Sequence, residues 1–153
     1  MNQGLVIVYT GEGKGKTTAA LGLALRAIGQ GKRVLMIQFL KSSKSYGELK
    51  ATASLAPLEA SRLVRDSKTP LTGLAPAFEI VQVGKGCIYS TKDTARYENC
   101  EACDFACHIN PENPDNKDRQ AAEQGFQLAQ QKIKSGTYDM IILDEINYAV
   151  SYG

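Results

Sequence analysis

The sequence has little net charge, few cysteines and no long apolar run, and each shortage excludes a class of protein. Its formal charge is +2, from 18 basic and 16 acidic residues, so no strong field attracts nucleic acid or a membrane surface. No segment approaches the roughly 20 consecutive apolar residues that span a bilayer. The first residues lack the basic and apolar regions of a secretory signal. We therefore expect a cytoplasmic protein that binds neither nucleic acid nor membrane.

The length and the apolar content suit one globular domain. The chain has 153 residues, of which 43% are hydrophobic, enough for a single buried core. We expect one domain over residues 1–153, with irregular excursions at about 56–76 and 97–117, which are rich in proline or in cysteine and asparagine. A short helix, 58–64, is expected within the first excursion.

Short, almost continuously apolar segments predict a parallel sheet covered on both faces. The expected strands are Leu5–Tyr9, Val34–Phe39, Phe78–Val83 and Met140–Leu143. Helical spacing of apolar residues predicts a helix over 17–30, with Leu21, Leu25 and Ile28 on its apolar side, and another over about 118–134. The apolar face of the second helix is expected to comprise Phe126, Leu128, Ala129 and Ile133.

A glycine-rich loop lies between the first expected strand and the first helix, the context that a phosphate-binding loop requires. Its glycines let the backbone turn N–H groups towards an anion, and the helix directs the positive end of its dipole to the same place. The residues expected to bind ATP are Gly11, Glu12, Gly13, Lys14, Gly15, Lys16, Thr17 and Thr18. Lys16 would bring a positive charge to the outer phosphates. The usual first glycine is replaced by Thr10, and the alternative is a glycine- and lysine-rich surface turn.

The apolar segment 138–143 ends in two carboxylates, Asp144 and Glu145. In phosphate-loop folds such a strand lies beside the strand that precedes the loop, and its carboxyl end faces the loop. Asp144 or Glu145 could then hold Mg²⁺ opposite Thr17, because a hard cation prefers oxygen ligands. Lys16 and Glu145 are the catalytic candidates. The alternative is an ordinary strand followed by a solvated acidic turn.

Three cysteines and the single histidine lie within nine residues. Cys100, Cys103 and Cys107, completed by His108 or by Cys87, would form a tetrahedral Zn²⁺ site or hold an iron–sulfur cluster, and the ligand count does not separate the two. Free thiols in a flexible loop are the alternative. The spacing differs from that of covalent haem attachment, and four cysteines are too few and too clustered for a secreted disulfide framework.

Three blocks of the sequence, residues 4–22, 38–41 and 143–148, resemble the signature blocks of the bacterial corrinoid adenosyltransferases. The resemblance implies an α/β, P-loop NTPase-like (RecA-like) three-layer sandwich with a mostly parallel sheet. It implies that Co(I) of a reduced corrinoid attacks the 5′ carbon of ATP and that triphosphate leaves. It also implies a reduced flavoprotein as electron donor and a homodimer.

The sequence departs from the family in two places. The family's Gly-Phe-Thr-Trp stretch, whose aromatic residues exclude the corrinoid's lower axial ligand, aligns with residues 86–89, so its Phe and Trp positions hold Cys87 and Tyr89. The candidates for the corrinoid side are Cys87, Ile88, Tyr89, Asn147 and Tyr148. Cys87 could instead be a small core residue, a metal ligand or an axial contact to cobalt.

The second departure is length, because family members continue past the Asn-Tyr block. We therefore expect a sheet that lacks its C-terminal strands and exposes an edge. Two other functions are compatible with the motifs: a P-loop ATPase or kinase-like enzyme, and a nucleotide- and metal-binding sensor without turnover.

Overall fold

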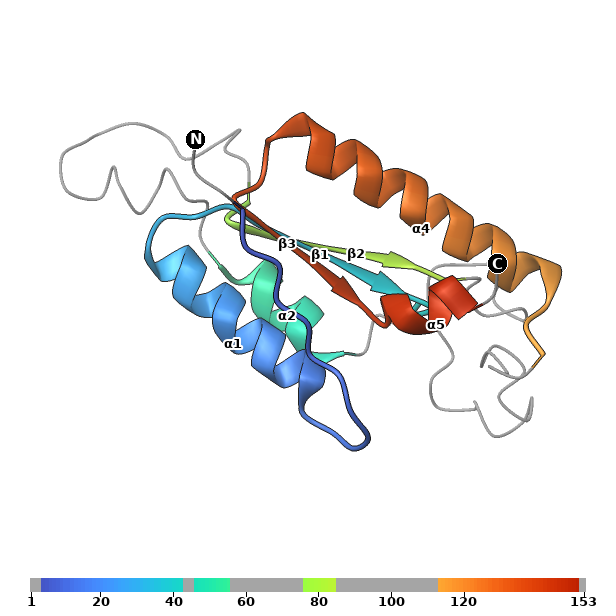
Figure 1. Ribbon diagram of the computed structural model, residues 1–153. Coiled ribbons are helices and arrows are strands. Elements are labelled where there is room, and N and C mark those ends of the chain that lie inside the picture. The colour runs from blue at the N-terminus through green and yellow to red at the C-terminus, as the bar shows by residue number, and fades with distance from the viewer. Residues whose placement is uncertain (1–3, 43–45, 56–75, 85–112, 152–153) are drawn as a thin grey trace, which may run out of the picture.

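The computed structural model describes residues 4–42, 46–55, 76–84 and 113–151. The described elements are α1 (Lys16–Gly29), β1 (Val34–Phe39), α2 (Gly47–Ala53), β2 (Phe78–Val83), α4 (Asn116–Ser135), β3 (Met140–Asp144) and α5 (Ile146–Ser151). The strands form a parallel sheet in the order β2-β1-β3. Figure 1 shows α4 on one face of this sheet, with α1 and α2 on the other, so the arrangement is the expected α/β sandwich.

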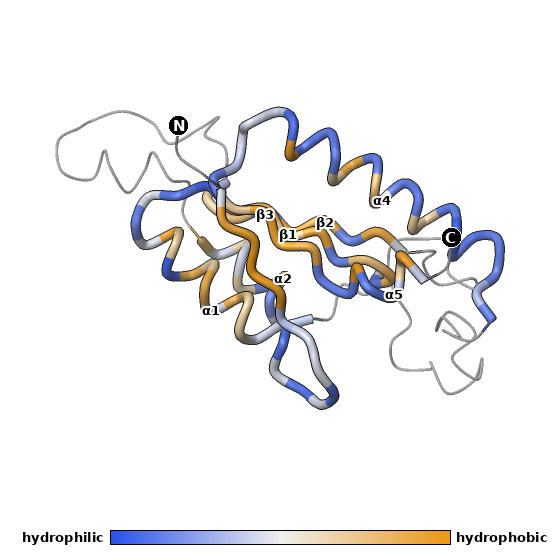
Figure 2. Tube along the Cα trace, in the orientation of Figure 1, coloured by the Kyte–Doolittle hydropathy of each residue, from blue (hydrophilic) through white to orange (hydrophobic). Residues whose placement is uncertain are grey.

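The central strand β1 is buried along its whole length, and its side chains alternate between two apolar clusters. Leu35, Ile37 and Phe39 pack with alanines of α4 and α5. Val34 and Met36 pack on the opposite face with Ala24 of α1. Figure 2 shows the three strands as mostly apolar stretches, whereas polar residues recur along α4. The predicted strands at 34–39, 78–83 and 140–143 are confirmed.

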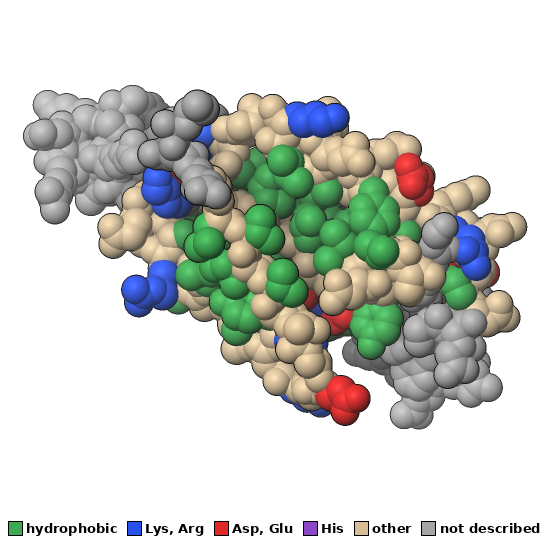
Figure 3. Space-filling model, in the orientation of Figure 1, with side chains coloured by type: hydrophobic (Ala, Val, Ile, Leu, Met, Phe, Trp, Pro, Cys, Tyr) green, Lys and Arg blue, Asp and Glu red, His purple; other side chains and the backbone are tan. Residues whose placement is uncertain are grey.

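The predicted strand Leu5–Tyr9 is wrong for this structure. The segment is not part of the sheet, and Leu5 and Val6 are 83% and 86% exposed. Among the described residues, β3 pairs with β1 and with no other strand, so it is not paired with Leu5–Tyr9 as expected. An apolar run favours burial, but a strand also needs a neighbour whose N–H and C=O groups pair with its own. Figure 3 shows apolar side chains gathered at the middle of the face that is turned to the viewer, between α1 and α4.

Helix α4 begins and ends at strong local signals. The carboxylate of Asp115 accepts a hydrogen bond from the backbone N–H of Asp118 at 2.9 Å. The carboxylate of Asp118 in turn accepts one from the backbone N–H of Asp115 at 3.0 Å. Gly136, with φ of 63°, ends the helix. The helix was predicted to within about two residues. The fold also contains α2 and α5, which the sequence patterns above did not predict, while the expected helix 58–64 lies outside the described residues.

The expected apolar faces of α1 and α4 each contain one wrong residue. Leu25 and Ile133 are 62% and 56% exposed. The most deeply buried positions of both helices are mostly small residues, which allow a close approach of helix and sheet, while Leu21, Ile28, Phe126 and Leu128 are partly buried against the core. The buried positions are Ala20 and Ala24 in α1, and Asp118, Ala121, Ala122, Gly125 and Ala129 in α4.

At Gly125, helix α4 lies close to side chains of the sheet. A Cβ atom at this position would lie 2.5 Å from Phe39 Cε1 and 2.8 Å from Val83 Cγ2. We therefore expect Gly125→Ala to lower the free energy of unfolding by about 1–3 kcal/mol, although alanine is the better helix former. Gly22→Ala in α1 is the control, because a Cβ there meets nothing within 4 Å. Urea unfolding that finds both variants stabilised would contradict this packing.

Candidate functional site

The glycine-rich loop has the backbone shape that its sequence predicts. Gly11, Gly13 and Gly15 have φ values of 126°, 93° and 110°, in the region that residues with a Cβ rarely adopt. Helix α1 begins directly after Gly15, so its N-terminal N–H groups and the loop share one end of the helix. The loop residues are exposed, and an anion can therefore approach them from solvent.

Lys16 holds the loop in its curved form. Its Nζ donates to the carbonyl oxygens of Gly11 and Gly13, both at 2.7 Å. Lysine is a compact positive charge on a flexible stem, so the ammonium can exchange these carbonyls for phosphate oxygens in the same place. Sequence reasoning thus identified both the loop and the cation at its centre.

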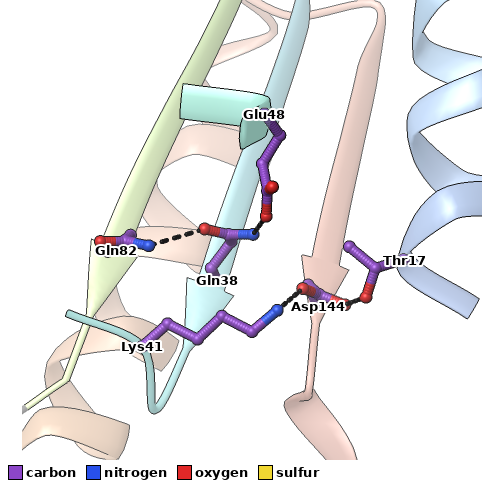
Figure 4. A network of polar contacts seen from close by, with 6 residues as sticks. All are labelled: Thr17, Gln38, Lys41, Glu48, Gln82 and Asp144. Carbon is purple, nitrogen blue, oxygen red and sulfur yellow. Dashed lines mark hydrogen bonds and ion pairs between the residues drawn. The ribbon is translucent and has the colours of Figure 1, made fainter. Parts of the chain in front are cut away.

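The loop and the acidic strand end meet through Thr17 and Asp144. The Thr17 hydroxyl donates to Asp144 Oδ1 at 3.0 Å, across 127 positions of sequence. Asp144 is the last residue of β3, and it is 9% exposed. Glu145 follows with φ of 60°, an unusual value for a residue with a side chain, and leads into α5. The predicted approach of the carboxyl end of this strand to the loop is therefore confirmed (Figure 4).

Lys41 binds the second oxygen of the same carboxylate. Its Nζ lies 2.6 Å from Asp144 Oδ2, and the two side chains are 18% and 8% exposed. Lys41 follows β1 after Leu40, whose φ of 62° turns the chain at the end of the strand. The sequence patterns did not single out Lys41 as a site residue, although it belongs to one of the three family-like blocks.

A buried polar row crosses the sheet beside these groups (Figure 4). Gln38 is paired in register with Gln82 and with Asp144, so the three side chains lie on one face at one level. Gln38 Nε2 donates to Glu48 Oε1 of α2 at 3.0 Å, and its Oε1 accepts from Gln82 Nε2 at 2.9 Å. A glutamine in an otherwise apolar strand was the signal that could have identified this row.

The hydrogen bonds of Gln38 should contribute measurably to the free energy of unfolding, because Gln38 is 0% exposed and has two polar partners. Gln38→Leu leaves the hydrogen-bonding groups of Glu48 and Gln82 without this partner, and we expect it to lower the free energy of unfolding by about 1–3 kcal/mol. Gln127→Leu, on the exposed side of α4, should change it by less than about 0.5 kcal/mol. Chemical denaturation of both variants checks this. A Gln38→Leu protein as stable as the wild type would contradict it.

The groups with shifted pKa values lie at the opposite, amino end of the strands. Burial, followed by a hydrogen bond to Glu79, raises the pKa of Tyr138 to about 12. The backbone N–H of Arg33, donating at 2.9 Å, lowers the pKa of Asp139, and the Lys32 ammonium lowers it further. Their contacts join the residues at the amino ends of the strands to one another, away from the loop.

Asn147 and Tyr148 lie in α5, directly after Glu145, and both are exposed. They therefore follow the same end of β3 as Asp144.

The remaining corrinoid candidates, Cys87, Ile88 and Tyr89, lie outside the described residues, as does the proposed metal loop of Cys100, Cys103, Cys107 and His108. Within the described ranges, no group of three or more His, Cys, Asp or Glu side chains could hold a metal ion. No helix in the same ranges is long and apolar enough to cross a membrane.

Comparisons with known proteins agree with the resemblance. The sequence model of the family ATP:corrinoid adenosyltransferase BtuR/CobO/CobP matches residues 2–153. A corrinoid adenosyltransferase of Escherichia coli is 30% identical over 150 residues, which are 98% of this chain and 55% of that protein. The corrinoid adenosyltransferase CobA of Salmonella typhimurium is 29% identical over 150 residues, again 98% of this chain and 55% of that protein.

A corrinoid adenosyltransferase of Pseudomonas aeruginosa is 27% identical over 151 residues, 99% of this chain and 55% of that protein. The chain thus spans about half the length of the curated relatives it matches. No solved structure matches it significantly. The family match, however, covers nearly the whole chain, including the loop and the acidic strand end described above. The chain belongs to the ATP:corrinoid adenosyltransferase family of BtuR, CobO and CobP.

Proposed function

We propose that this protein transfers the 5′-deoxyadenosyl group of ATP to Co(I) of a reduced corrinoid and releases triphosphate. The observation that carries the proposal is the contact between Thr17, at the start of α1, and Asp144, at the end of β3. This contact joins the phosphate-loop helix to a carboxylate, as a Mg²⁺–polyphosphate site requires. The P-loop NTPase-like fold, with the loop and β3 as its two nucleotide-binding parts, belongs to the same proposal.

In this reaction the electron pair of Co(I) forms a bond to the 5′ carbon, and the C5′–O bond breaks with its electron pair on the triphosphate. No phosphoryl group moves. The protein therefore has to hold the triphosphate still and to stabilise the negative charge that develops on it. Backbone N–H groups of the loop and the Lys16 ammonium suit both tasks. We assign the nucleotide to residues 11–18 and the corrinoid side to residues 87–89, Asn147 and Tyr148.

The residues around Thr17 fit a Mg²⁺ ion that is shared with phosphate. Mg²⁺ takes few protein ligands and keeps oxygen ligands from phosphate and water. Thr17 and Asp144 supply oxygen atoms that are already adjacent, and Glu145 follows Asp144 directly. When bound, the ion would neutralise charge on the triphosphate. The same proposal includes a reduced flavoprotein as electron donor, a homodimer and a cytoplasmic location.

The test is to supply reduced cobalamin, ATP and Mg²⁺ without oxygen. Formation of the cobalt–carbon bond is followed by its absorption spectrum, and the phosphorus products are identified by ³¹P NMR. The proposal predicts adenosylcobalamin and triphosphate in equal amounts. ADP or orthophosphate without a cobalt–carbon bond would instead indicate an ATPase or kinase, and nucleotide binding without turnover would indicate a sensor.

A further inference from the structure

Lys41 has a charged contact in the site but no part in the function proposed so far. Its ammonium is bound to Asp144, the carboxylate that also accepts from Thr17. With 18% of its side chain exposed, Lys41 is largely shielded from water. A shielded ammonium is stable only while it has an anionic or strongly polar partner.

The backbone of Lys41 lies against the end of β2, and its ammonium is carried on a long side chain. A Cβ on Gly84, at the end of β2, would lie 2.8 Å from the carbonyl oxygen of Lys41, so the two backbones are in close contact. The Nζ also lies 5.5 Å from the centre of the Tyr46 ring, just before α2. A fixed backbone and a flexible four-carbon stem let the ammonium change partners without moving the fold.

Both oxygens of Asp144 are engaged, one by the Thr17 hydroxyl and one by Lys41. A divalent cation bound between Thr17 and Asp144 would compete with the ammonium for a single negative charge, and the two cations would repel each other. Within the described part of the chain, Asp144 is the one carboxylate that forms an ion pair with Lys41. The displaced ammonium would need another anion close by.

The polyphosphate that arrives with the metal is such an anion. We propose that Lys41 is a second polyphosphate-binding lysine, whose ammonium leaves Asp144 when Mg²⁺ and nucleotide bind and then pairs with phosphate oxygens beside Lys16. This inference rests on the proposed function only for the identity of the ligand, which is a Mg²⁺–polyphosphate nucleotide. Asp144 thereby exchanges one cation for another, and the site gains a positive charge for the leaving triphosphate.

The test measures binding by calorimetry with three probes: Mg²⁺–ATP, Mg²⁺–tripolyphosphate and adenosine. Lys41→Met should weaken the two polyphosphates by at least about 10-fold and leave adenosine within about twofold. Lys41→Arg keeps the charge and should stay within about threefold of the wild type. Lys50→Met, an exposed lysine of α2, is the matched control and should bind as the wild type does.

An affinity of Lys41→Met for polyphosphate that is unchanged or higher overturns the inference. If Lys41 only occupies Asp144, its removal frees the carboxylate for Mg²⁺, and Lys41→Met then binds Mg²⁺–tripolyphosphate as well as the wild type or more tightly. In that case wild-type binding of Mg²⁺–ATP still supports the proposed function. Failure of the wild type to bind any of the polyphosphates would reject both.

A second measurement follows the ammonium of Lys41 in the wild-type protein, and a variant is needed only to assign the signal. The side-chain ammonium signal of Lys41 is assigned by ¹⁵N NMR from its loss in Lys41→Arg. Adding Mg²⁺–tripolyphosphate should shift this signal and couple it to phosphorus. A signal that stays unchanged at saturation would place the ammonium on Asp144 throughout and reject the exchange.

Discussion

Lys16→Met is expected to lower the rate of adenosyl transfer by about 100-fold or more, as loss of one hydrogen-bond donor at a developing negative charge does in other enzymes. The variant loses the ammonium that donates to the carbonyls of Gly11 and Gly13 at 2.7 Å, and with it the charge proposed to meet the phosphates. The loop should lose the hydrogen bonds that hold its shape, and its affinity for polyphosphate should fall. Initial rates with reduced cobalamin, at saturating ATP and Mg²⁺, measure the effect.

Lys134→Met provides the comparison for that variant. Lys134 lies in the last turn of α4, is exposed, and lies in a different element from the loop. Its replacement should change the rate by less than about twofold, because isolated surface charges contribute little. Equal rates for Lys16→Met and Lys134→Met would show that the loop does not hold the nucleotide during transfer.

Asp144→Asn is expected to raise the Mg²⁺ concentration needed for half-maximal activity by about 10-fold or more, and to lower the maximal rate. The amide oxygen can still accept from the Thr17 hydroxyl, whereas the ion pair with Lys41 is lost. A neutral amide, however, attracts a divalent cation far less than a carboxylate does. Rates measured over a series of Mg²⁺ concentrations separate the two effects.

Asp139→Asn is the matched control for the same strand. Asp139 precedes β3 at its other end and pairs with Lys32 at 3.4 Å, away from the loop. Its replacement should leave the dependence on Mg²⁺ unchanged. If Asp144→Asn also left it unchanged, the metal would have to be held elsewhere, and the proposed role of β3 would fail.

The parts of the site that the sequence predicted are those set by local chemistry and by sheet geometry. Glycines at 11, 13 and 15 predicted a sharply bent loop before a helix, and their positive φ values agree with such a bend. Thr17 and Asp144 were expected to lie close together from the usual place of an acidic strand end in phosphate-loop folds, and they do so although Leu5–Tyr9 is not part of the sheet. Neither inference needs knowledge of how side chains pack over long distances.

The parts that escaped prediction depend on partners far away in the sequence. Leu5–Tyr9 has the composition of a strand, but composition does not supply the neighbouring strand with which it would pair. Ile133 has the right spacing for the core, yet small residues of α4 approach the sheet in its place. Lys41 becomes visible only when Asp144, 103 positions later, is seen beside it.

The central claim is that the C5′–O bond of ATP breaks and that triphosphate leaves intact. ATP labelled with ¹⁸O in the C5′–O bridge tests this claim directly, with mass spectrometry of the products after a single anaerobic turnover with reduced cobalamin. The account predicts that the label leaves in triphosphate and that the adenosylated corrinoid carries none. Label recovered in ADP would mean that the terminal phosphorus is the reacting atom, and would contradict the account.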